Sequence, residues 1–123
     1  MLKKMLILTV GTGTRIDVDI LKPLLKTIKD SAPKFIGFIT SQESNKFAEE
    51  IIRQLGLSSQ QFDILTLSES ENIERIYSCI NKWMRSLVAR GYSPQEITVD
   101  FTSGTKAMTS GAVLAGVAWG CAG

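Results

Sequence analysis

The hydrophobic and polar positions of this chain switch repeatedly between the pattern of a buried strand and that of an amphipathic helix. Continuous or alternating apolar runs predict strands at residues 5–10, 34–39 and 62–67, and a fourth strand that begins at Ile97. After each run, apolar residues recur at helical spacing. Such β-α repeats with short connections predict an α/β fold, a Rossmann-like doubly wound parallel sheet in three layers. The residues expected on the buried stripes of the first three helices are Ile20, Leu21, Leu24, Leu25 and Ile28; Phe47, Ile51, Ile52 and Leu55; and Ile73, Ile76, Ile80, Met84, Leu87 and Val88.

Short polar segments predict where the helices begin and end. Residues 40–43 and 68–71 have the spacing of capping boxes and are expected to open the second and third helices. Gly56 is the expected end of the second helix. The last helix begins near Lys106 and is apolar almost all round. A doubly wound domain normally continues from such a helix into another strand, so we expect residues 1–123 to be one domain and the N-terminal part of a longer protein. The alternative is that a partner subunit covers this helix.

Composition narrows the classes of function. The net charge of +2 is too small to indicate general binding of duplex DNA. The chain has no His, which excludes His-based acid–base catalysis and His-ligated metal sites, and no metal site or cofactor is predicted. Cys79 and Cys121 lie far apart in sequence, as suits a reducing cytoplasm. No apolar segment reaches the roughly 18 residues that a membrane span needs, so we expect a cytoplasmic protein.

Two loops rich in glycine and hydroxyl residues follow the first and fourth predicted strands. Residues 102–105 lead into the helix that begins near Lys106, where backbone N–H groups and the helix dipole favour an anion. The alternative is an ordinary turn with a solvated lysine. In the common 3-2-1-4 strand order this loop converges with residues 11–14. Arg15 either clamps a phosphate or is a solvated residue, and the residues after the second strand either add hydrogen bonds or simply cap the helix. The candidate ligand-binding residues are Gly11, Thr12, Gly13, Thr14, Arg15, Thr40, Ser41, Thr102, Ser103, Gly104, Thr105 and Lys106.

Other nucleotide sites fit the sequence less well. Ile16 stands where a dinucleotide fingerprint has its third glycine, and no acidic residue follows the second strand. The P-loop spacing and the GxSxG elbow are absent. Asp100, at the end of the fourth strand, either holds a metal or base role or hydrogen-bonds the next turn. The residues expected to serve packing rather than chemistry are Trp83, Trp119 and Met108.

The segment Thr102-Ser-Gly-Thr-Lys-Ala-Met108 resembles the signature turn of CRISPR-associated Rossmann fold (CARF) domains, in which a hydrophobic strand ends in a [ST]-[GS]-G-T-K-x-M motif. Residues 10–14 are similar to the loop after the first strand of these domains. The resemblance covers essentially the whole chain.

This resemblance implies that the chain senses cyclic oligoadenylate, with cyclic tetra-adenylate the expected ring, as the N-terminal domain of a type III CRISPR ancillary protein in antiviral defence. It implies a homodimer with the ligand across the two-fold axis, controlling an appended effector. Some CARF domains also cleave the ring without a metal, and Lys106 is then the expected charge-stabilising catalytic residue. The alternatives are such a ring nuclease, a generic nucleotide-binding α/β domain and a dimerisation domain without a ligand.

Overall fold

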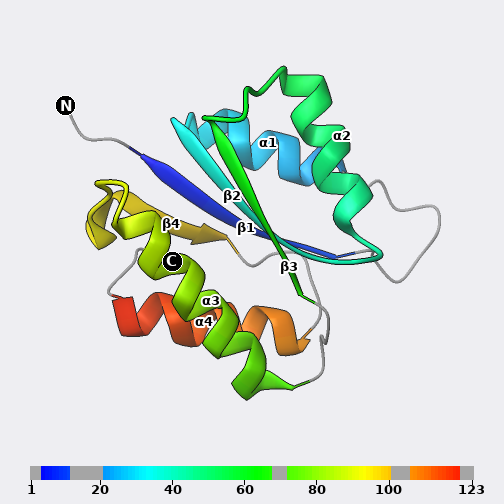
Figure 1. Cartoon of the computed structure of the whole chain (residues 1–123). Coiled ribbons are helices and arrows are strands. Elements are labelled where there is room, and N and C mark those ends of the chain that lie inside the picture. Colours follow the sequence, from blue (N-terminus) through cyan, green and yellow to red (C-terminus); the bar gives the residue numbers. More distant parts are fainter. Residues whose placement is uncertain (1–3, 12–20, 68–71, 101–105, 120–123) are drawn as a thin grey trace.

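The computed structural model describes residues 4–11, 21–67, 72–100 and 106–119. Within them, a four-stranded parallel sheet has the order β3-β2-β1-β4, which confirms the predicted α/β fold and strand order. Helices α1 and α2 cover one face of the sheet, and α3 and α4 cover the other (Figure 1). The elements are β1 (Met5–Val10), α1 (Leu21–Ser31), β2 (Phe35–Ser41), α2 (Asn45–Leu55), β3 (Phe62–Leu67), α3 (Ile73–Val88), the 3-10 turn η1 (Pro94–Glu96), β4 (Ile97–Asp100) and α4 (Lys106–Trp119).

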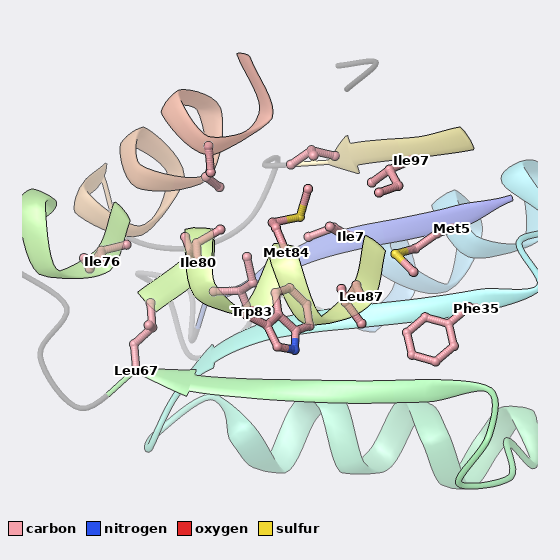
Figure 2. Close-up of a cluster of buried hydrophobic side chains, with 14 residues drawn as sticks. Met5, Ile7, Phe35, Leu67, Ile76, Ile80, Trp83, Met84, Leu87 and Ile97 are labelled. Carbon is pink, nitrogen blue, oxygen red and sulfur yellow. The ribbon is translucent and has the colours of Figure 1, made fainter. Parts of the chain in front are cut away.

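The two covered faces explain why β1 is apolar at almost every position. Successive side chains of a strand point to opposite faces. Leu6, Leu8 and Val10 therefore enter the core beneath α1 and α2. Met5 and Ile7 enter the core beneath α3 and α4, which Figure 2 shows. A strand in the middle of such a sheet has no solvent side, so the alternation between apolar and polar residues disappears.

Trp83 of α3 lies across the sheet at the level of Gly37, and it is buried with the α3 and α4 core. A Cβ atom on Gly37 would come within 2.5 Å of Trp83 Cη2 and 2.9 Å of Cζ2. The indole therefore occupies the space that any side chain at position 37 would need. Ile7, Gly37 and Asp63 are paired in register, and Trp83 Nε1 donates to Asp63 Oδ2 at 3.0 Å. The packing role expected of Trp83 is confirmed.

The predicted start of the second helix is wrong. Strand β2 continues through Ser41, and α2 begins only at Asn45. Thr40 is paired with Val10 of β1 and Thr66 of β3, so the ladder holds it in the strand. Ser44 occupies the N-cap position of α2, without a side-chain capping bond.

The start of α3 and the end of α2 can both be compared with the predicted helix ends. The Asn72 side chain caps α3 by accepting from Arg75 N at 3.2 Å, and residues 68–71, which carry the capping-box spacing, lie outside the described residues. Gly56 ends α2 in a left-handed conformation with φ of 64°, as predicted.

The helix stripes are confirmed in their centres and wrong at two ends. Leu55 and Ile73 are exposed, because each lies at a helix terminus beyond the cover of its neighbours. Trp119 packs against the α3 and α4 core as expected, with Nε1 donating to Asn81 Oδ1 at 2.7 Å. Ile20 and the Met108 side chain lie outside the described residues. Across the described part of the chain, no helix is both long and apolar enough to cross a membrane.

Candidate functional site

The candidate site lies at the carboxyl edge of the sheet, where ligands bind in open α/β folds. Strands β1 and β4 are neighbours, with Leu8 paired to Asp100. Their exits therefore lie side by side, as the loop prediction requires. Gly11 follows β1 directly and is buried. Helix α4 begins at Lys106, as predicted, on the far side of the loop that leaves β4.

Of the twelve predicted site residues, the structure describes Gly11, Thr40 and Ser41 in full and the backbone of Lys106. Residues 12–15 and 102–105, together with the Lys106 side chain, lie outside the described residues. Their roles in a ligand site remain predictions. The structure positions β1 and β4, from which the two loops leave, and the start of α4.

Thr40 belongs to a small polar cluster between β2, β3 and the start of α2. Its Oγ1 lies 3.2 Å from Thr66 Oγ1 and donates to Asn45 Oδ1 at 3.4 Å. Thr66 Oγ1 lies 3.5 Å from the same Asn45 oxygen, and Asn45 Nδ2 donates to Glu49 Oε1 at 3.1 Å. Thr40 is fully buried, so its hydroxyl holds the Asn45 side chain in place from the interior of the protein. In this cluster Thr66 is exposed and Asn45 partly exposed, and the ligand-binding role of Thr40 remains a prediction.

Ser41 and Ser44 brace the turn from β2 into α2. Ser41 N donates to Ser44 Oγ at 2.9 Å, and Ser44 N donates to Ser41 Oγ at 3.2 Å. The two hydroxyls are also 3.1 Å apart. These reciprocal bonds satisfy the N–H groups of the last residue of β2 and of the N-cap residue of α2. Ser41 thus shapes the loop at the carboxyl edge, and it is itself partly exposed.

Thr9 ties together the ends of β1 and β4. Its hydroxyl donates to the backbone carbonyl of Asp100 at 3.5 Å, and the residue is fully buried. The contact adds to the backbone pairing of the two strands that lead into the glycine-rich loops. It also shows that the Asp100 main chain takes part in structure, while the role of its carboxylate remains a prediction.

The resolved pKa shifts belong to groups away from the exits of β1 and β4. On the outer surface of α2, the hydrogen bond from Arg53, followed by one from Gln54, lowers the pKa of Glu50 to about 2. Tyr92, whose ring is tilted against that of Phe35 at the start of β2, has a pKa raised mainly by burial. The pKa shifts of Glu50 and Tyr92 therefore come from hydrogen bonds and burial within the fold, and not from the candidate site.

Sequence reasoning missed Asn45 and Thr66 as members of this edge. The signal was present in the strand pattern: Thr66 is a polar residue close to the carboxyl end of a strand whose other polar residue is Asp63. Its register with Thr40 places both hydroxyls on one face. Asn45 is the first residue of α2, which begins later than predicted.

Comparisons with known proteins find likeness among solved structures. No protein-family model matches the chain, and no curated protein matches it. Among solved structures, Enterococcus italicus Csm6 bound to cyclic hexa-2'-fluoro-hexa-dAMP matches with a TM-score of 0.69 and 18% sequence identity. The match covers 96% of this chain and 31% of the Csm6 chain. It confirms the resemblance noted from the sequence at the level of the fold.

Proposed function

We propose that this chain is a sensor domain of a type III CRISPR-associated protein, which binds cyclic oligoadenylate across a homodimer and controls an appended effector. One observation carries the proposal: the chain shares its fold, over 96% of its length, with a protein solved in complex with a cyclic adenylate analogue. The proposal places the domain in the cytoplasm and in antiviral defence. The effector belongs to the part of such a protein that this chain does not represent, since the chain spans 31% of the length of Csm6.

The physical basis of binding is the pair of loops at the exits of β1 and β4. Backbone N–H groups of residues 11–14 and 102–105 meet the ring, and the N-terminus of α4 favours its phosphates. Lys106, in the first turn of α4, is unfavourable for the helix dipole by itself. A bound phosphate removes that conflict. Asn45 and Thr66 extend the polar rim along the same edge of the sheet.

The two-fold arrangement follows from the symmetry of the ligand. A ring of identical nucleotides has rotational symmetry, which two copies of one surface match. Helix α4 begins at the candidate site and exposes Val113, Leu114 and Val117 to solvent. Three apolar side chains along one helix face are the kind of surface that a second subunit covers. We place the dimer contact on this face of α4, so that the ring and the interface share one helix.

The decisive experiment is calorimetric titration of cyclic tetra-adenylate and cyclic hexa-adenylate into the purified chain. The proposal expects binding of one ring per two chains, with the tighter ring identifying the ligand. Lys106→Ala should weaken binding by about tenfold or more, because a hydrogen bond to a charged group contributes roughly 1.5–3 kcal/mol. Lys34→Ala is the matched control, because this exposed lysine precedes β2 at the amino ends of the strands. The affinity of this variant for the ring should equal that of wild type.

Two outcomes contradict the proposal. A folded dimer that binds neither ring, while ATP or NAD stabilises it thermally, indicates a generic nucleotide-binding domain. Equal losses of affinity in Lys106→Ala and Lys34→Ala indicate a non-specific electrostatic effect. Incubation of each ring with the purified chain also tests for cleavage. Linear products that end in a 2′,3′-cyclic phosphate identify a ring nuclease.

A further inference from the structure

Strand β3 forms one edge of the sheet, as Figure 1 shows. An edge strand presents backbone N–H and C=O groups with which a strand of another molecule can pair. In a parallel ladder, alternate residues bond to the neighbouring strand. Ile36 N donates to Gln61 O at 3.0 Å, which sets the parity of the β2 and β3 ladder. Gln61, Asp63 and Leu65 therefore face β2, and the backbone groups of the residues between them point outward.

The outward N–H at the middle of this edge already has an acceptor. Ile64 N donates to Asp63 Oδ1 at 2.9 Å. The second carboxylate oxygen of Asp63 accepts from Trp83 Nε1 at 3.0 Å. Trp83 is itself fixed in the core against Gly37, so its indole N–H is a rigid donor. The carboxylate is thus held against the strand edge by the tertiary structure, rather than by the backbone of β3 alone.

The strand that this carboxylate covers has the composition of a self-pairing segment. Its six residues, FDILTL, include β-branched, aromatic and aliphatic side chains and no Gly or Pro. Asp63 is the only charged residue among them. Segments of this length with high β propensity and low charge stack edge to edge when they are exposed. Proteins counter this tendency with an inward-pointing charge on the edge strand.

We infer that Asp63 is an edge guard, whose carboxylate occupies the outward N–H of Ile64 and so keeps β3 from pairing with β3 of a second copy of this chain. A second copy is the relevant partner because identical strands pair antiparallel about a two-fold axis, with the same register on both sides. The guard directs association away from this edge. It does not depend on the proposed ligand, and it holds for any function of the domain.

The test compares variants that separate the effect of the Asp63 carboxylate on self-association from its effect on thermal stability. Asp63→Ala uncovers the Ile64 N–H and should self-associate beyond the wild-type state, with an association constant at least about tenfold higher in sedimentation and light scattering. Trp83→Phe removes the same indole hydrogen bond but leaves the Asp63 carboxylate beside Ile64. It should lose thermal stability without added association. Asp63→Asn retains one side-chain oxygen that accepts from Ile64 N, but its NH2 group then faces the Trp83 indole N–H, so it should keep the wild-type association state and lose thermal stability.

The inference is overturned if folded Asp63→Ala keeps the association state of wild type, or if Trp83→Phe associates as strongly as Asp63→Ala. Hydrogen exchange on the wild-type protein provides a measurement that needs no variant. The Ile64 amide should exchange at least about tenfold more slowly than the outward amide of Thr66 on the same strand. An Ile64 amide that exchanges as fast as that of Thr66 overturns the inference as well.

Discussion

At the scale of single residues, the clearest constraint is the contact between Gly37 and Trp83. The indole reaches across β2 only because position 37 has no side chain, and its N–H then meets Asp63 on β3. A glycine in the middle of a strand usually weakens that strand. Here its absence of a Cβ admits a large buried side chain that links three elements, which offsets the loss.

This contact predicts the effect of Gly37→Ala. The added methyl meets aromatic carbons of Trp83 inside a closed core, and overpacking of this kind costs about 1–3 kcal/mol of unfolding free energy. Urea denaturation measures the loss. In a Trp83→Phe background the shorter ring leaves room for the methyl, so the same substitution should cost clearly less. Equal costs in the two backgrounds would show that the strand backbone, and not the indole, rejects the methyl.

At the scale of elements, α4 carries two glycines with different surroundings, Gly111 against α3 and Gly116 toward β4. A Cβ on Gly111 would run into the side chain of Ile76 and would lie 3.4 Å from Tyr77 N. A Cβ on Gly116 would meet only Val99 Cγ2, at 3.5 Å. The first glycine allows two helices to approach closely, whereas the second has space for a methyl group.

The pair predicts opposite signs for the same substitution. Gly111→Ala should destabilise the domain by about 1–3 kcal/mol, because the buried β-branched Ile76 has little rotamer freedom in which to move aside. Gly116→Ala should stabilise it by up to about 1 kcal/mol, because alanine favours the helix more than glycine does. Chemical denaturation of the two variants and wild type gives both values. Stabilisation by both substitutions would contradict the close approach at Gly111.

At the scale of the whole molecule, the strand order determines where chemistry can occur. Strand β1 lies inside the sheet, so the loop after it and the loop after β4 leave from neighbouring strands although some 90 residues separate them in sequence. Helix α4 then carries the chain from that edge along the face of the sheet shared with α3 (Figure 1). Its exposed apolar residues, Val113, Leu114 and Val117, lie in the C-terminal half of the helix.

This arrangement predicts that Val117→Lys disrupts the proposed dimer. Val117 is 75% exposed, so the monomer should tolerate the lysine, whereas an interface would bury an unpaired charge. Self-association measured by sedimentation should weaken by about tenfold or more, and affinity for the ring should fall with it. Gln54→Lys, on the exposed surface of α2, is the control and should leave both unchanged. Unchanged association in Val117→Lys would place the dimer contact elsewhere.

The sequence by itself determined the kinds of element, their order and the edge at which a site would form. Hydrophobic period distinguishes strands from helices locally, and the parallel crossover rules leave few arrangements for β-α repeats. The glycine-rich segments after the first and fourth strands pointed to one edge for the same reason.

Tertiary structure decided what local signals left ambiguous. Thr40 had the spacing of a helix cap, but pairing with β1 and β3 keeps it in the strand, because a ladder between two neighbours outweighs a single capping bond. The contact of Trp83 with Gly37 and Asp63 also joins residues whose proximity depends on how α3 crosses the sheet, which no local pattern encodes.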